Sequence, residues 1–465
     1  MHSKSINTQV FILFCLMLIV SCKSYTLSDL DYSNYVLVNA TDSKTYKYKT
    51  YKARTVENLK GFTIAEDPEV GRYGGWKTEQ YTATGYFRTE KVNGRWWIID
   101  PEGYPFIHRG VAVLRPGRSN KHKVELNSRF GSETQWIEKE TDFLKSYGFN
   151  GAGAWSNTEL IKNSSNPLIY SIIIQPMRSF RNEDIKQNKS KYEEAGSSVY
   201  RYDLVMVFDP KFDEYVESTI SEIASYSNDK NLLGYYIDNE LPWKDDALDR
   251  HLKYLSEDEP GYVAAKSWFT DRKGEGASIS DITESDRNDF LAFYFETYMK
   301  KVTTVLKKYD PNHMFLGCKF NIPNQELSSP DIFKVAGRYM DIISINHYFK
   351  WEPNRGLMEK WESWSGKPFI ITEWYTKSED SGLSNYWGAG WIVPTQADRG
   401  YFYQNFTLEL LKSKSCVGWD WFRYQDEGTS NKGLLNSSYE PYMPLMEKAK
   451  MVNMNTYQLI QFFDK

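Results

Sequence analysis

Two glutamates that close long apolar runs are the residues of this 465-residue chain best placed to do chemistry. Glu240 directly follows the run Leu232–Asn239. Glu373 lies near the end of the run Phe369–Trp374. Hydrolysis of a glycosidic bond needs such a pair, because a carboxylic acid protonates the leaving oxygen while a carboxylate attacks or stabilises the sugar carbon. The pattern therefore predicts glycosidic chemistry at this pair, with Asn239 supplying amide donors for a sugar hydroxyl.

A non-catalytic interpretation of these residues stays open. A single glutamate at a strand end is more often an ion-paired structural group, so a catalytic role requires two of them in matching positions. Aromatic residues make up 16% of the chain, and surplus rings often line a binding site. A surface glycan-binding lipoprotein that has lost its chemistry is therefore the second hypothesis, although a binder has no need of a carboxylate pair.

Eight short apolar runs alternate with longer amphipathic segments from residue 105 onward. Buried parallel strands read as continuous apolar runs because both of their faces are covered. The expected strands are Phe106–Val113, Phe149–Trp155, Leu168–Gln175, Leu232–Asn239, Met314–Phe320, Ile342–Phe349, Phe369–Trp374 and Val417–Tyr424. This alternation predicts an α/β fold, a (β/α)8 TIM barrel, with Glu240 and Glu373 closing strands four and seven at the face where barrel enzymes act. A doubly wound open sheet is the competing fold, but residues 110–113 lack its glycine-rich phosphate turn.

The segments between these strands supply helices and long insertions. Apolar residues recur at helical spacing over Ser285–Tyr309, Glu133–Tyr147 and Tyr401–Ser413. Residues 177–204 follow the third strand and residues 241–283 follow the fourth. Because the carboxyl ends of barrel strands carry the binding loops, these two long segments are expected to form walls of a substrate cleft.

The first residues read as an export signal. Residues 1–21 contain Lys4 and an apolar run that is short for a membrane span, and Ile19-Val20-Ser21-Cys22 resembles a bacterial lipobox. Lipidation at Cys22 predicts an exported lipoprotein of the outer membrane or cell surface, with the membrane as a partner through this anchor. The polar residues 22–55 are expected to act as its tether. An ordinary cleaved signal peptide, leaving a periplasmic or secreted protein, is the alternative.

A small β-rich segment, residues 56–104, is expected to precede the catalytic barrel of residues 105–465. Asn93-Gly94 is the strongest hairpin signal in the chain and lies between the β-prone arms of Gly85–Asp100. The segment is too short to bury a core of its own. We therefore expect it to pack against the barrel.

Charge and spacing argue against several other classes of function. The 57 Lys and Arg nearly balance the 61 Asp and Glu, for a formal net charge of −4, so no nucleic-acid partner is expected. The six histidines show no HxH, HExxH or HxxxH spacing, so no metal site is expected either. No cofactor is predicted, and the expected partner is a polysaccharide or oligosaccharide substrate.

The two carboxylate strands resemble those of a known group of enzymes. Tyr235-Tyr236-Ile237-Asp238-Asn239-Glu240 and Ile370-Ile371-Thr372-Glu373-Trp374 are similar to the Asn-Glu and Glu signatures of clan A retaining glycoside hydrolases. Gly94–Phe106, Gly388–Phe406 and Gly418-Trp419-Asp420-Trp421-Phe422 resemble family 50 β-agarases and their relatives. The resemblance covers about residues 85–430 and implies that Glu240 is the acid/base and Glu373 the nucleophile of an agarase-like β-galactan hydrolase. Other clan A activities, β-galactosidase or β-glucanase, stay open.

The same resemblance implies sugar contacts at other strand ends. His347 and Tyr348 close strand six, where clan members often position the nucleophile with an aromatic residue or a histidine. The remaining candidate contacts are Trp374, Trp419 and Trp421 as the floor of a sugar subsite, and Trp155, Asn157 and His108 at the ends of strand two and within strand one. Core packing is the alternative for the indoles.

Overall fold

The computed structural model describes residues 31–465 except 43–44, 46, 65–68, 197–198 and 323–328. The predicted signal peptide, Cys22 and the first residues of the predicted tether lie outside the described residues. Within that described part, none of the helices combines the length and the apolar character that a membrane crossing requires.

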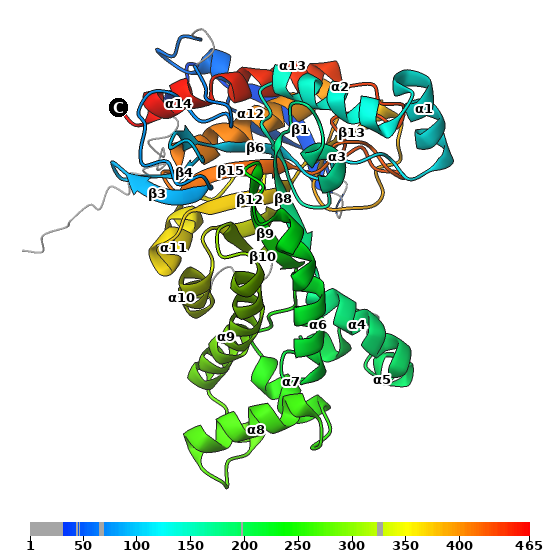
Figure 1. The fold of residues 1–465 in the computed structure, drawn as a ribbon, viewed down its shortest axis with the longest axis vertical. Coiled ribbons are helices and arrows are strands. Elements are labelled where there is room, and N and C mark those ends of the chain that lie inside the picture. Colours follow the sequence, from blue (N-terminus) through cyan, green and yellow to red (C-terminus); the bar gives the residue numbers. More distant parts are fainter. Residues whose placement is uncertain (1–30, 43–44, 46, 65–68, 197–198, 323–328) are drawn as a thin grey trace, which may run out of the picture.

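Eight parallel strands close into a barrel (Figure 1). In order around the barrel they are β6 (His108–Val111), β7 (Gly151–Ala152), β8 (Ile169–Ile174), β9 (Leu232–Asn239), β10 (Met314–Ile322), β11 (Ile343–His347), β12 (Phe369–Trp374) and β15 (Cys416–Trp421). Strand β15 pairs with β6 to close the ring, with Gly418 opposite His108. Each strand overlaps one of the eight predicted runs, so the predicted TIM barrel is confirmed.

Two apolar layers hold the barrel together. One includes Leu233, Tyr236 and Ile370 and fills the interior of the ring. The other includes Tyr235 and Ile371 and lies between the strands and the helices. Successive side chains of a strand point to opposite faces, which is why adjacent tyrosines of β9 fall in different layers. Both faces of the strand are therefore apolar, as its continuous apolar run predicts.

Helices connect the barrel strands and follow the last of them. They are α1 (Asn120–Phe130), α2 (Glu133–Ser146), α3 (Thr158–Lys162), α4 (Pro176–Gln187), α5 (Lys189–Glu194), α6 (Lys211–Ile220), α7 (Ala247–Tyr254), α8 (Pro260–Lys273), α9 (Glu284–Tyr309), α10 (Pro330–Tyr339), α11 (Arg355–Ser365), α12 (Gln396–Lys412), α13 (Met443–Met454) and α14 (Thr456–Phe463). The three predicted helices correspond to α2, α9 and α12. Helix α9 begins at a capping box, in which the side chains of Thr283 and Asp286 each accept the other residue's backbone N–H.

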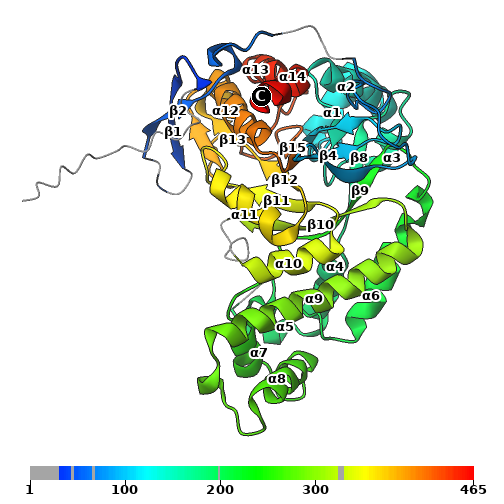
Figure 2. The ribbon, with the colours of Figure 1, turned by 90° about the vertical axis from the view of Figure 1, so that its left-hand side faces the viewer.

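Helices α4, α5, α7 and α8 form a helical extension that projects from the barrel (Figures 1 and 2). These helices come from the two long segments after β8 and β9. Helix α9 packs against α7 and α8 and also against α10 beside the barrel. The long segments are therefore folded structure tied to the barrel, and the extension rises from the carboxyl ends of the strands.

The β-rich lead-in supplies β3 (Arg88–Val92) and β4 (Arg95–Ile99) to a three-stranded sheet, whose third strand, β5 (Pro105–Phe106), lies just past the predicted boundary at residue 104. Its hairpin turns at Asn93 and Gly94, both with positive φ, as the sequence predicts. Ile98 and Phe106 join the apolar interior of the barrel. The N–H of Trp96 donates to the carbonyl of Lys414, just before β15. The sheet thus covers the amino-terminal end of the barrel, opposite the strand ends that carry the two glutamates.

The prediction of a free tether is wrong for residues 36–53. Strands β1 (Val36–Asp42) and β2 (Lys49–Ala53) pair antiparallel, and β1 also pairs with β14 (Trp391–Val393), which lies beside β13 (Thr376–Ser378). Val38 and Ala40 are buried and alternate with the exposed Leu37 and Asn39. This two-residue period is typical of a half-buried strand, and the polar composition of the segment concealed it.

Candidate active site

Glu240 lies at the carboxyl end of β9, at the mouth of the barrel formed by the carboxyl ends of its strands. The backbone leaves strand geometry there, with φ of 57° at Asp238 and 52° at Glu240. The Glu240 N–H donates to the carbonyl of Lys319 on β10 at 3.0 Å. Left-handed conformations are costly for residues other than glycine and gather at functional sites. The surrounding contacts therefore hold this carboxyl group in a set position.

An amide on β11 orients the Glu240 carboxyl group. Asn346 Nδ2 donates to Glu240 Oε1 at 2.6 Å and to Asn239 Oδ1 at 3.2 Å. The Thr372 hydroxyl donates to Asn346 Oδ1 at 2.8 Å, which determines the end of the amide that serves as donor. Sequence reasoning missed Asn346. The available signal was a buried amide inside the apolar run Ile342–Phe349.

Glu373, near the end of β12, has a cation as its partner. Its side chain is buried, Lys319 Nζ pairs with Oε1, and the Tyr348 hydroxyl donates to Oε2. Hydrogen bonds to charged groups are shorter and stronger than those between neutral groups. Donors from β10 and from the end of β11 thus hold both carboxylate oxygens.

Lys319 is a fully buried cation that sequence reasoning also missed. Its Nζ lies 3.9 Å from the ring centroid of Trp155, so a cation–π contact accompanies the ion pair with Glu373. Burial lowers the pKa of Lys319, and the negative charge of Glu373 opposes that shift. The available signal was a lysine inside the apolar run Met314–Phe320, since a buried lysine needs a partner.

The electrostatic surroundings distinguish the two carboxyl groups. Burial, and after it the negative charge of Glu373, raises the pKa of Glu240 above its usual value. The hydrogen bond from Asn346 and the charge of Lys319 act in the opposite direction. Glu240 therefore retains its proton to a higher pH than an ordinary glutamate does, while Glu373 faces the cation of Lys319. An acid and a nucleophile need this division.

Asp238 anchors the end of β9 on its other side. Its Oδ2 and Oδ1 accept the N–H groups of Met177 (3.1 Å) and Arg178 (3.2 Å) in the first turn of α4. The Tyr298 hydroxyl of α9 donates to Oδ2 at 3.0 Å. Burial raises the pKa of Asp238 to about 7, and these donated hydrogen bonds oppose the shift. Asp238 thus connects the strand that carries Glu240 to two helices.

Trp374, Trp419 and Trp421 lie in the layer between the barrel and its helices. All three are fully buried. Trp374 stacks on Phe406 of α12 with ring centroids 4.5 Å apart, and Trp419 Nε1 donates to Tyr403 Oη at 3.0 Å. The prediction of a sugar-subsite floor is wrong for these indoles, because they are buried with the residues that lie between the barrel strands and the surrounding helices.

The two predicted histidine contacts are also wrong. His347 is buried edge-on to Phe406, with centroids 5.1 Å apart, and burial lowers its pKa to about 3. His108 is fully buried inside the barrel, where its Nε2 lies 2.9 Å from Asp420 Oδ1. Neither ring reaches the mouth, whereas Tyr348 contacts Glu373 directly.

The last two candidate contacts have different surroundings. Asn157 caps helix α3, where its side chain accepts the N–H of Leu160 at 3.2 Å. Trp155 is half-buried, with φ of 59°, and its ring lies beside Lys319. Of the predicted aromatic contacts, Trp155 and Tyr348 are therefore the two that the structure brings to the paired carboxyl groups.

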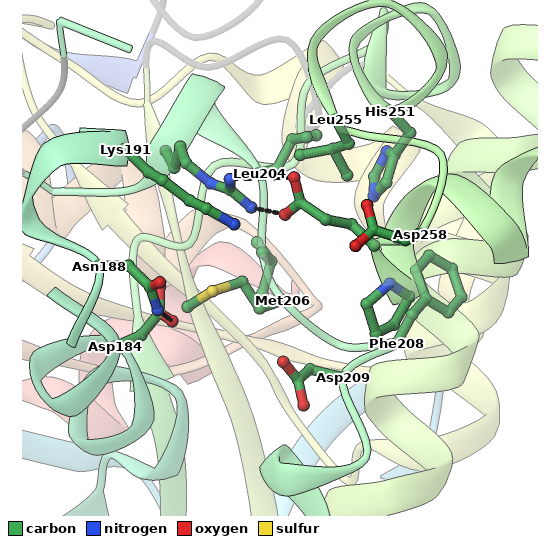
Figure 3. Close-up of a pocket in the computed structure, with 15 residues that line it drawn as sticks. Asp184, Asn188, Lys191, Leu204, Met206, Phe208, Asp209, His251, Leu255 and Asp258 are labelled. Carbon is green, nitrogen blue, oxygen red and sulfur yellow. Dashed lines mark hydrogen bonds and ion pairs between the residues drawn. The ribbon is translucent and has the colours of Figure 1, made fainter. Parts of the chain in front are cut away.

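A separate pocket of about 240 Å³ lies in the helical extension (Figure 3). Residues from both long segments line it, among them Asp184 from the first and His251 from the second. The ion pair between Arg201 and Glu259 joins the two segments there. No predicted site residue lines this pocket. The two long segments, which were expected to form walls of the substrate cleft, therefore line a separate pocket in the helical extension.

The mouth of the barrel combines a protonatable carboxyl group at Glu240 with a carboxylate at Glu373. Tyr348 and Trp155 lie beside them. Among the residues that the structure describes, no group of three or more His, Cys, Asp or Glu side chains is placed to hold a metal ion. The arrangement can donate a proton from one side chain and present an anion from the other.

Sequence comparison finds agarases among the curated proteins, while no family model matches the chain. The chain is 25% identical over 496 residues to beta-agarase B of Vibrio sp. (strain JT0107), an alignment that covers 85% of this chain and 51% of that protein. It is 24% identical over 410 residues to beta-agarase A of the same strain, with 77% and 39% covered. The chain thus spans about half the length, or less, of the curated relatives it matches.

Comparison of folds extends the match to nearly the whole chain. The crystal structure of BpGH50 is 33% identical with a TM-score of 0.82, and the alignment covers 93% of this chain and 96% of that one. The agarase AgWH50C shares the fold at 22% identity and a TM-score of 0.69, with 85% and 67% covered. On the nearly full-length match to BpGH50, the chain belongs to glycoside hydrolase family 50.

Proposed function

We propose that this protein is a retaining glycoside hydrolase that cleaves β-linked galactan chains of the agarose type. The observation that carries the proposal is the pair of carboxyl groups at the ends of β9 and β12, Glu240 with a raised pKa and Glu373 against a cation. The curated relatives are named as beta-agarases, which supports a galactan as substrate. β-Galactosidase and β-glucanase activities are the alternatives.

The proposed reaction proceeds through two displacements at one carbon. A carboxylate oxygen of Glu373 attacks the anomeric carbon, the glycosidic C–O bond breaks, and the leaving oxygen takes the proton of Glu240. The Glu240 carboxylate then takes a proton from water, whose oxygen displaces Glu373 from the same carbon. Two inversions retain the configuration. Lys319 and Tyr348 hold the attacking carboxylate of Glu373 during these two steps.

A polysaccharide panel tests this proposal. Reducing-end release is measured on agarose, porphyran, carrageenan, β-galactan and β-glucan for the wild type, Glu240→Gln and Glu373→Gln. Glu359→Gln, at an exposed position on α11, is the matched control. We expect the highest rate on agarose, and a loss of about 10³-fold or more in both site variants. Product sizing separates endo from exo cleavage, and NMR of the first product gives the anomeric configuration. Full activity in both site variants, or an inverted product, contradicts the proposal.

We also propose that the protein is exported and held at a membrane by a lipid on Cys22. The lipobox-like residues 19–22 after an apolar run support this proposal. Cys22→Ala is expected to move the protein from the membrane fraction to the soluble fraction without changing its specific activity. Mass spectrometry of the amino terminus identifies the lipid. An unchanged distribution between the fractions contradicts the anchor.

A further inference from the structure

Two neighbouring aromatic rings are exposed on the loop between β13 and β14. Trp387 is 69% exposed and Tyr386 is 64% exposed. The rings meet edge to face, with centroids 5.1 Å apart. Leaving large rings in water forgoes the stabilisation that their burial gives, and exposed apolar patches mark binding surfaces.

A buried lysine holds the backbone beneath these rings. Lys377 Nζ donates to the carbonyls of Asn385 (3.0 Å), Trp387 (3.5 Å) and Gly388 (3.2 Å). The Ser430 hydroxyl also donates to the Trp387 carbonyl, at 2.5 Å. The backbone that carries the exposed indole is therefore fixed from inside the protein.

Asn385 fixes the same loop just before the two rings. Its N–H donates to Thr429 O at 2.9 Å, its Nδ2 donates to Ser378 O at 2.8 Å, and its Oδ1 accepts the Asn431 N–H at 2.8 Å. The side chain is buried, and the backbone is left-handed with φ of 56°. A loop that is already ordered loses little entropy when a ligand binds.

The loop also adjoins the proposed catalytic carboxylate. A Cβ placed on Gly388, whose φ is 93°, would lie 2.7 Å from the Tyr375 hydroxyl oxygen. The Tyr375 ring centroid is 5.5 Å from that of Tyr348, whose hydroxyl donates to Glu373. The backbone that carries Trp387, one residue before this glycine, therefore lies close to the residues at the mouth of the barrel.

We propose that Trp387 and Tyr386 form an aromatic platform on which a sugar of the polysaccharide chain stacks, outside the sugars held at the paired carboxyl groups. The flat CH face of a galactose ring packs well on an indole, and the loop that carries the platform adjoins Tyr375, whose ring contacts Tyr348 beside Glu373. This inference rests on the proposed function and deepens it. The platform makes long chains better substrates than short ones, because a short chain that fills the site at the carboxyl groups does not reach it.

Kinetics on long and short substrates test the aromatic platform. The double variant Tyr386→Ala/Trp387→Ala is expected to raise KM for agarose about tenfold, with a much smaller change for an agarose-derived disaccharide glycoside. Trp387→Phe keeps a stacking ring and should retain most of the affinity. Trp96→Ala, at the amino-terminal end of the barrel, is the matched control and should leave both KM values unchanged. An agarose KM that is equal in the wild type and the double variant overturns the platform.

Retention on agarose beads separates the platform from the catalytic proposal. Glu373→Gln is compared with the same protein carrying both alanine substitutions, and we expect the alanines to weaken retention about tenfold. If the wild type releases no reducing ends from any polysaccharide but retention still depends on the rings, the proposed function fails and the platform stands. Equal retention with and without the rings overturns the platform whatever the activity.

Discussion

The two carboxyl groups at the barrel mouth occupy equivalent strand ends in different surroundings. Glu240 accepts a hydrogen bond from the amide of Asn346, and burial together with the charge of Glu373 raises its pKa. Glu373 contacts the ammonium of Lys319 and the hydroxyl of Tyr348. Neighbouring strands therefore set the chemistry of a strand-end glutamate, since β11 supplies the amide for Glu240 and β10 supplies the cation for Glu373.

Removing the carboxylate that faces the cation should have the largest effect. Glu373→Ala is expected to lower kcat on agarose by about 10⁵-fold, because no other group supplies the attacking oxygen. Azide should restore part of the rate and give a glycosyl azide of configuration opposite to the original linkage, which NMR identifies. An inverted azide formed by Glu240→Ala instead would exchange the roles of the two carboxyl groups.

Removing the carboxyl group with the raised pKa should have the next largest effect, and it should depend on the leaving group. Glu240→Ala is expected to lose about 10³-fold on agarose and far less on an aryl glycoside, whose leaving phenol needs little protonation. Wild-type activity should fall as pH rises through the raised pKa of Glu240, because the acid then loses its proton. This alkaline limb should be missing from the Glu240→Ala profile. Equal losses on both substrates contradict the acid role.

Removing the buried cation, Lys319, should affect both Glu373 and Glu240. Lys319→Met is expected to lower kcat about 100-fold, because Glu373 loses its charged donor. The positive charge of Lys319 lowers the pKa of Glu240, so its loss should move the alkaline limb of the pH–activity profile to higher pH. Lys360→Met, at an exposed position on α11, serves as the control. A limb that stays in place, or moves to lower pH, counts against this coupling.

Removing the amide should have the smallest effect and should act on Glu240. Asn346→Ala is expected to lower kcat about tenfold, because one hydrogen bond no longer orients the acid. That hydrogen bond lowers the pKa of Glu240, so the alkaline limb should again shift to higher pH. Azide should not rescue this variant, since Glu373 remains in place. A shift of the limb to lower pH would mean that the amide favours the protonated acid.

The barrel and its carboxyl pair were predictable because both depend on patterns within single segments. A parallel strand covered on both faces leaves a continuous apolar run, and barrel geometry brings the ends of all eight runs to one face. Glu240 and Glu373 follow from this rule without any knowledge of their neighbours. Their partners, Asn346 and Lys319, come from other runs, so contacts between strands decide which buried polar residue meets which carboxyl group.

The side to which each aromatic ring points was less predictable. Glu373 and Trp374 are adjacent, yet the first faces Lys319 and the second packs on helix α12. The pairing of β12 with β15 is irregular between Ile371 and Trp374, so alternation counted from the run alone does not establish the face. The exposure of Trp387 was equally hard to predict. The backbone of this residue is held by Lys377, a buried lysine ten residues earlier, and composition does not reveal that contact.

The pairing of β1 with β14 affects the order in which the protein can fold during synthesis. Thr41 lies opposite Ile392, so one edge of β1 must wait for its partner until most of the chain has left the ribosome. Contacts this distant in sequence form slowly, because the intervening chain must first be brought together. The pairing of β1 with β14 therefore cannot form before the chain has been made as far as β14, although the partner strand β2 is available from the start.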